Sequence, residues 1–223
     1  MNKLHIPPLD EQAAKTALEH QKILAKPPLA LGKLEPVAIQ IAAMTGNPAP
    51  RLKDKAVVLF AADHHIADHG LSLTSTDVTY IQTRNFLQGG GTINAFTRNA
   101  GARLSVVDVG VNYDFGDLPG LVKRKVMHGA NDFSRGPAMT REQALECLQV
   151  GIDMAREEKA RGLDIVAAGE MGIGNTTPSS AIVAVLTGTP VETVTGRGSG
   201  VKGEVIRKKI ELIEQGIDRK SVV

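Results

Sequence analysis

Short apolar runs alternate along this chain with longer segments of helical pattern, and this alternation constrains the fold more than any other feature. The clearest run, residues 56–62, has no polar interruption, which is typical of a strand buried on both faces of a parallel sheet. Residues 103–109 and 164–168 show the same pattern, and residues 191–194 show it weakly. The alternation predicts an α/β fold with a doubly wound, mostly parallel sheet of Rossmann-like topology.

The clearest predicted helix covers residues 140–160, where apolar residues recur every three or four positions and Thr140 with Gln143 fits a capping box. Four further helices are predicted at residues 77–87, 92–99, 178–186 and 201–215. The first 45 residues contain two helical segments separated by a diproline, and no strand pattern. We therefore expect residues 1–45 to form a helical region packed on the core, and residues 46–223 to form one α/β domain.

Composition excludes several classes of protein. Lys and Arg number 26 against 24 Asp and Glu, and aromatic residues make up 3% with no Trp, so a nucleic-acid binder is disfavoured. No apolar run approaches the roughly 20 residues that span a bilayer, and the N-terminus does not resemble a secretory signal. Cys147 is the single cysteine of the sequence, which favours a reducing, cytoplasmic location.

Glycines cluster where predicted strands end. The segment Gly169–Pro178 (GEMGIGNTTP) follows an apolar strand and leads into an apolar helix, for which Thr177 is the predicted N-cap. Close backbone approach and the positive end of a helix favour an anion such as phosphate, although a purely structural turn is the alternative. Glu170 would repel that anion unless it faced a hydroxyl group or a cation.

A second glycine cluster, Gly196–Gly200, is followed by a run of basic residues: Lys202, Arg207, Lys208 and Lys209. This arrangement fits a second contact to a phosphate, and a solvated charge run is the alternative.

Two other segments carry polar side chains near the predicted ligand edge. Asp63, His64 and His65 suggest a metal site, but adjacent histidines point apart on any regular element. A hydrogen-bonded Asp63–His64 pair or direct substrate contact is the preferred interpretation. In the following helix, Thr74 or Gln82 could bind the ring nitrogens of a heterocycle, unless they belong to an ordinary solvated face.

Taken together, these segments resemble the nicotinate-nucleotide:dimethylbenzimidazole phosphoribosyltransferases, which build the lower ligand of cobalamin. Six ordered motifs carry the resemblance: residues 26–35 (family pattern KPPGSLGxLE), 62–70 (ADHGVxxxG), 85–95 (NFxxGGxxIN), 107–111 (VDVGV), 169–178 (GEMGIGNTT) and 194–198 (VTGRG). Two small departures stand out. Leu29 and Ala30 replace Gly-Ser, and His65 replaces a glycine, which leaves the local backbone shape open.

The resemblance implies transfer of a phosphoribosyl group from nicotinate mononucleotide to 5,6-dimethylbenzimidazole, with α-ribazole 5′-phosphate and nicotinate as products and with no cofactor or metal. It places Thr74 and Gln82 at the benzimidazole, and makes residues 46–223 a nucleotide-binding domain. The residues that it places at the ribose and phosphate are Glu170, Gly172, Gly174, Asn175, Thr176, Thr177 and Lys209. It also suggests a homodimer, while the nearly balanced charge disfavours a nucleic-acid or membrane-surface partner.

The resemblance further implies a longer protein, whose C-terminal third carries a glutamate that acts as general base on the azole. No residue up to Val223 matches that glutamate, so we identify no catalytic residue in this sequence. We expect a chain with an unpaired sheet edge and an uncovered apolar face that self-associates and is poorly active by itself. The alternatives are a non-catalytic homologue that binds nicotinate mononucleotide and a metal-dependent hydrolase.

Overall fold

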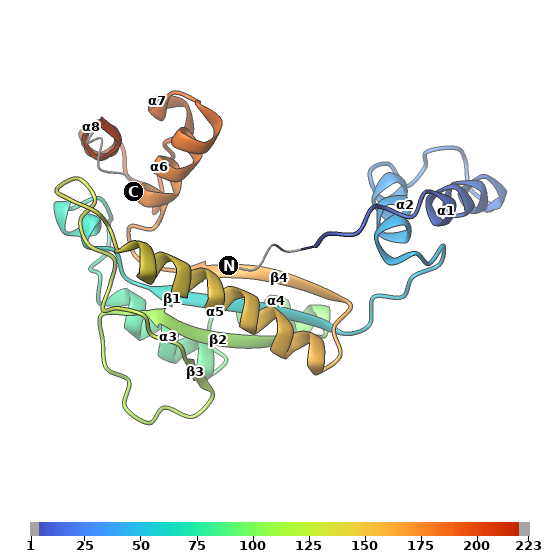
Figure 1. The fold of residues 1–223 in the computed structure, drawn as a ribbon, viewed down its shortest axis with the longest axis horizontal. Helices are drawn as coiled ribbons and strands as arrows, with labels where there is room; N and C mark the ends of the chain where they lie inside the picture. Colours follow the sequence, from blue (N-terminus) through green and yellow to red (C-terminus); the bar gives the residue numbers. More distant parts are fainter. Residues whose placement is uncertain (1–4, 219–223) are drawn as a thin grey trace. The chain divides into compact units, whose positions relative to one another are not determined.

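The computed structural model describes residues 5–218, and the chain falls into two compact units, one up to Lys53 and one from Asp54 onward (Figure 1). The first unit contains the two predicted helices, α1 (Glu11–Ile23) and α2 (Leu34–Thr45). The N-cap of α1 is Asp10, whose side chain accepts a hydrogen bond from the Ala13 amide at 2.8 Å.

The segment between α1 and α2 is fixed by a buried ion pair between Lys26 and Glu35, with 2.7 Å between Nζ and Oε1. Hydrogen bonds from Lys26 and from the Leu31 amide lower the pKa of Glu35. In this segment Leu29 has a φ of +59°, in the left-handed region, and it is the residue that stands where the family pattern has glycine. The backbone shape that glycine would adopt freely is therefore kept by a leucine.

The second unit is built on a four-stranded sheet with the order β3-β2-β1-β4. Its strands are β1 (Lys55–Ala62), β2 (Ala102–Gly110), β3 (Leu121–Lys123) and β4 (Ile165–Met171). All three strand pairings are parallel, which confirms the predicted α/β fold with a parallel sheet. The short strand β3 was not expected from the sequence.

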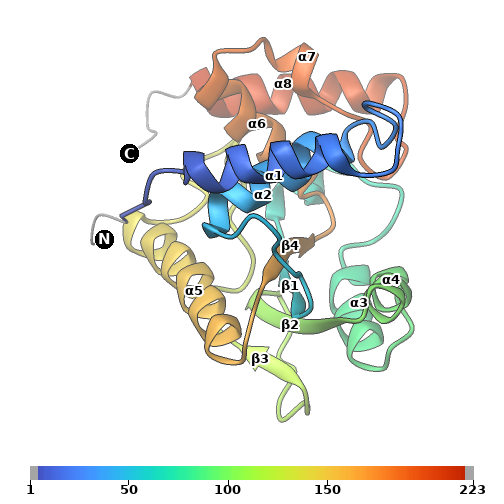
Figure 2. The same cartoon turned by 90° about the vertical axis from the view of Figure 1, so that its right-hand side faces the viewer.

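Helices cover both faces of this sheet, as the doubly wound prediction requires. Figure 2 shows α5 on one face and α3 with α4 on the other. The helices of this unit are α3 (Val78–Leu87), α4 (Thr92–Ala100), α5 (Arg141–Ala160), α6 (Thr176–Thr187), α7 (Val191–Val194) and α8 (Glu204–Asp218), with the 3-10 helix η1 (His65–His69) after β1. The predicted capping box is present at the start of α5, between Thr140 and Gln143.

The apolar runs fill two cores because successive strand residues point to opposite faces. On one face Val58 and Val107 pack against Met154 of α5. On the other face their neighbours Leu59 and Val106 pack toward α3 and α4. An uninterrupted apolar strand is therefore what this fold requires.

Two predictions about the C-terminal part are wrong. Residues 191–194 form the one-turn helix α7 rather than a strand, because Pro190 starts the turn and its carbonyl accepts from the Thr193 amide. The helix α6 begins at Thr176 with Asn175 as N-cap, so Thr177 lies inside the first turn and is not the cap. Proline at position 178 is tolerated there because an amide in the first turn lacks an intrahelical partner in any case.

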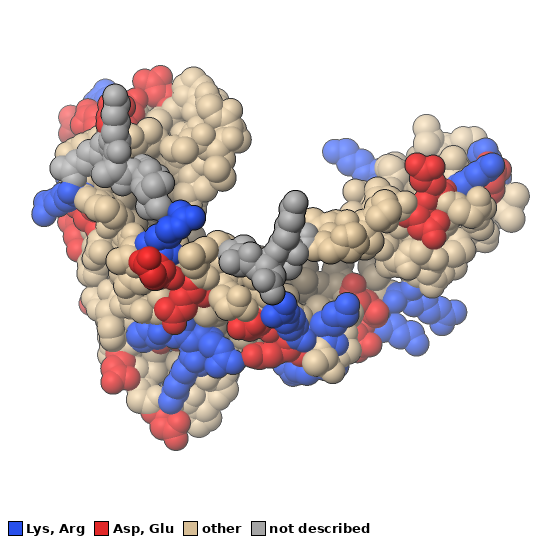
Figure 3. Space-filling view, in the orientation of Figure 1, with Lys and Arg blue, Asp and Glu red and all other residues tan. Residues whose placement is uncertain are grey.

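The surface of the second unit differs between its elements. Positive and negative side chains are interspersed over α5, whereas the segment 176–191 contains no charged residue (Figure 3). The strand β4 is an edge of the sheet, and Ile165 and Val166 on it are exposed, as are Val185 and Leu186 on α6. No helix among residues 5–218 is long and apolar enough to cross a membrane.

Candidate functional site

The carboxyl ends of β1, β2 and β4 meet at one edge of the sheet, where parallel sheets bind ligands. The pairing places Phe60 beside Glu170 and Ala62 beside Gly110, so the loops after all three strands begin at the same level. The helices α6, α7 and α8 lie beyond this edge (Figure 1). The predicted glycine-rich loop after β4 is therefore brought next to the Asp-His segment after β1.

A buried lysine joins the two predicted glycine loops. Lys209 of α8 is 1% exposed, and its Nζ donates to Thr176 Oγ1 at 2.7 Å and to the Gly196 carbonyl at 3.1 Å. Gly198 also lies at this point, because an added Cβ would be 2.8 Å from Thr176 Oγ1. Burial lowers the pKa of Lys209, and no carboxylate of residues 5–218 forms an ion pair with it. These bonds bring the second glycine cluster to the start of α6, where the sequence predicts an anion.

Lys209 reaches this point, whereas two other basic residues of the run predicted to contact a phosphate do not. Lys208 instead donates to the His69 carbonyl at 2.7 Å, and Arg207 is an exposed partner of Glu204. Lys208 thus makes a structural contact and Arg207 is solvated, which fits the alternative of a solvated charge run for these two residues.

Glu170 lies at the end of β4 with its two carboxylate oxygens held differently. Oε2 accepts a hydrogen bond from the Asn175 side chain, and Oε1 lies 3.7 Å from His64 Nε2. Its side chain is 41% exposed, so it remains accessible to a ligand. Burial raises the pKa of Glu170, and the interaction with His64 acts in the opposite direction.

Glycine is required at position 172 because backbone and side-chain atoms of three residues lie close to its Cα. A Cβ there would lie 2.3 Å from the Ala62 carbonyl oxygen, 2.6 Å from Glu170 Oε1 and 2.9 Å from His64 Nε2. Gly174 has a φ of +87° and lies equally close to Ala67 of η1. The glycines of this loop thus let it pack against the segment that follows β1.

The residues predicted at the benzimidazole lie on and before α3. Gln82 is half-buried and accepts from the Asn85 side chain at 3.0 Å, while Thr74 is exposed in the preceding loop. Ser72 in that loop is 3.2 Å from Ser199 Oγ, which ties the loop to the second glycine cluster. Fully buried Thr79 accepts from the Ile173 amide at 3.1 Å and so fixes α3 against the first glycine loop. Sequence reasoning missed Thr79, because its partner lies far away in the chain.

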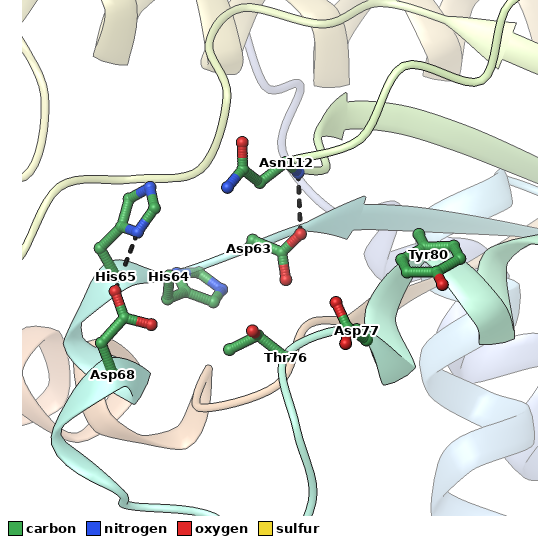
Figure 4. Close-up of a pocket in the computed structure, with 8 residues that line it drawn as sticks. All are labelled: Asp63, His64, His65, Asp68, Thr76, Asp77, Tyr80 and Asn112. Carbon is green, nitrogen blue, oxygen red and sulfur yellow. Dashed lines mark hydrogen bonds and ion pairs between the residues drawn. The ribbon is translucent and has the colours of Figure 1, made fainter.

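A pocket of about 180 Å³ lies beside this cluster, as Figure 4 shows. Asp63 does not pair with His64 there: its Oδ2 accepts from the Asn112 amide at 2.8 Å, and its Oδ1 is buried without a hydrogen-bond partner. The neighbouring His65 pairs with Asp68, with 3.1 Å between Nδ1 and Oδ2. The full lining is Asp63, His64, His65, Asp68, Thr76, Asp77, Tyr80 and Asn112. In the described part of the chain, no group of three or more His, Cys, Asp or Glu side chains is arranged to hold a metal ion.

This chain is similar to known proteins in both sequence and fold. A family model described as phosphoribosyltransferase matches residues 6–222. The nicotinate-nucleotide–dimethylbenzimidazole phosphoribosyltransferase of Geobacter sulfurreducens is 48% identical over 94% of this chain, and that of Chloroflexus aggregans is 47% identical over 96%. The chain spans 60% of the length of each of these relatives.

A solved structure has the same fold. The crystal structure of CobT from Thermus thermophilus superposes with a TM-score of 0.90 at 42% sequence identity. The match covers 95% of this chain and 64% of that one. The chain therefore belongs to the nicotinate-nucleotide–dimethylbenzimidazole phosphoribosyltransferase family.

Proposed function

We propose that this chain binds nicotinate mononucleotide and transfers its phosphoribosyl group to 5,6-dimethylbenzimidazole, giving α-ribazole 5′-phosphate and nicotinate in cobalamin lower-ligand synthesis. The proposal is supported by the relatives, whose names state these two substrate classes. Within the chain, it depends above all on the buried ammonium group of Lys209.

Lys209 and the start of α6 carry charge of the same sign. The amino end of a helix is equivalent to roughly half a positive charge, and the Lys209 ammonium is hydrogen-bonded to Thr176, the first residue of that helix. Without an anion these two positive groups repel each other in a place from which water is largely excluded. A phosphate would offset both, and the third N–H of the ammonium is available to donate to it.

The geometry also suits the sugar. In the reaction a nitrogen of the azole attacks C1′, the bond from C1′ to the nicotinate nitrogen breaks, and its electron pair neutralises the pyridinium. C1′ gains positive charge on the way, which a nearby carboxylate stabilises. Glu170 lies at the carboxyl end of β4 and can accept hydrogen bonds from ribose hydroxyls. The azole must lose its proton to a base, and we assign none of the described residues to that step.

The test is to add nicotinate mononucleotide alone in a calorimeter, and then both substrates with detection of α-ribazole phosphate by mass spectrometry. A full-length member of the family is the positive control. Binding together with product would support transfer, whereas binding without product would favour the non-catalytic alternative. Absence of nucleotide binding by a folded chain would overturn the assignment of the site. The homodimer and the cytoplasmic location stay predictions, to be tested by light scattering and cell fractionation.

A further inference from the structure

The imidazole of His64 is placed beside Glu170 but makes no hydrogen bond with it. Its Nε2 is buried and has no hydrogen-bond partner, although Glu170 Oε1 is 3.7 Å away. Burying a polar nitrogen without a partner costs free energy of folding. Such a cost is expected where a contact is completed by substrate, because catalytic hydrogen bonds are often long in the unliganded state.

The backbone fixes where this imidazole lies. His64 pairs in parallel with Ala130, and the amide of the next residue donates to the Ala130 carbonyl at 2.9 Å. Glycine at 172 keeps the space between the two side chains free, because an added Cβ would lie 2.9 Å from His64 Nε2 and 2.6 Å from Glu170 Oε1. The backbone of His64 is therefore fixed by main-chain contacts beside Glu170, and its side chain is 18% exposed.

We propose that His64 is a positioning residue for Glu170, holding Oε1 while Asn175 holds Oε2, so that the carboxylate faces the ribose and C1′ of the nucleotide. This inference rests on the proposed function and adds a residue to its site. Neither side chain alone would fix the carboxylate, because a single contact leaves its terminal torsion free. Among the described residues, His64 is the titratable group that acts on Glu170, and it lowers the pKa that burial raises.

The first experiment needs no activity. The Glu170 carboxyl is labelled with ¹³C and titrated by NMR in the unliganded chain, with Glu170→Gln to assign its signal. Replacing His64 with Phe should shift the titration midpoint of Glu170 upward, because the imidazole lowers that pKa and burial is retained. His65→Gln is the matched control: this neighbouring histidine bonds Asp68, so the midpoint should stay in place. An unchanged midpoint in a folded His64→Phe, or an equal shift in the control, would overturn the proposal.

The second experiment measures product formation by the chain. If the chain forms no product by itself, the matching substitution is made in a full-length relative and measured there. His64→Phe should lower kcat about ten- to hundredfold with little change in KM for the nucleotide. His64→Gln, which keeps a donor near the Nε2 position, should recover part of the loss and also serves if the Phe variant does not fold. Equal losses in the two variants would refute the positioning role. Failure of the proposed function would give a different result. The unaltered chain would not bind the nucleotide, while His64→Phe would still shift the titration midpoint of Glu170 upward.

Discussion

Replacing Lys209 with Met is the most direct test of the proposed anion site. The ammonium has three N–H groups, and Thr176 Oγ1 and the Gly196 carbonyl use two of them. One N–H therefore remains for a phosphate oxygen. A hydrogen bond to a charged group contributes about 1.5–3 kcal/mol, and each 1.4 kcal/mol is about tenfold in affinity. We expect the dissociation constant for nicotinate mononucleotide to rise about 10- to 150-fold.

The same substitution should not destabilise the unliganded fold in proportion. Burial lowers the pKa of Lys209, which means that the charged form is disfavoured in the folded state. Methionine keeps the length and apolar stem of the side chain, and removing the buried charge offsets the loss of the donor to Thr176 Oγ1 and the Gly196 carbonyl. We therefore expect the free energy of unfolding in urea to stay within about 1 kcal/mol of the unaltered chain.

Calorimetry of nucleotide binding measures the first effect, and Lys159→Ala is the matched control. Lys159 is exposed near the end of α5, so its loss changes the net charge equally without touching the site. Undiminished affinity in a folded Lys209→Met would remove this lysine from the site. Equal weakening by both substitutions would mean that net charge, rather than a local phosphate contact, governs binding.

Four further predictions concern the pocket and the backbone. Gln82→Ala should weaken benzimidazole binding more than nucleotide binding in titration calorimetry; equal losses would indicate a folding defect. Gly172→Ala forces a Cβ against a backbone carbonyl and should cost about 1–3 kcal/mol in urea unfolding, whereas Gly151→Ala in α5 meets open space and should be neutral or stabilising. Leu29→Gly should stabilise by about 0.5–1 kcal/mol in the same assay, because a left-handed leucine costs roughly 1–2 and glycine loses about 0.5–1 through chain entropy. His65→Gly should destabilise by about 1 kcal/mol. The backbone argument would be contradicted if Leu29→Gly destabilised the chain and His65→Gly stabilised it.

Local signals predicted most of the fold. The strands β1, β2 and β4 follow from short apolar runs, and the long helix α5 follows from apolar periodicity and a capping box. These signals depend on neighbouring residues alone. The three-residue strand β3 gave no such pattern, because it is too short to show periodicity. Residues 191–194 were misassigned because β-branched residues favour strands only where a neighbouring strand can pair with them, and the turn at Pro190 prevents this.

The candidate site divides in the same way. The hypothesis of an anion site follows from local sequence, because the strand, the glycine loop and the helix start lie within one short segment. The environments of Thr79 and His64 were not, because their partners Ile173 and Glu170 lie about a hundred residues away and are brought close by the pairing of β1 with β4. The expected Asp63–His64 pair was inferred from adjacency in sequence. The structure separates the two, since consecutive side chains after a strand point in different directions.

The two small departures from the family pattern show why a motif has to be read through its backbone. Both replace a glycine, yet Leu29 has a φ of +59°, whereas His65 is not among the residues with positive φ. At His65 the backbone needs no glycine, and the imidazole gains contacts to Asp68 and to the His128 carbonyl. At Leu29 the side chain is 74% exposed and gains little burial to offset the strained backbone. Loss of a glycine is therefore accommodated at His65 and carries a cost at Leu29, and the sign of φ at each position decides the outcome.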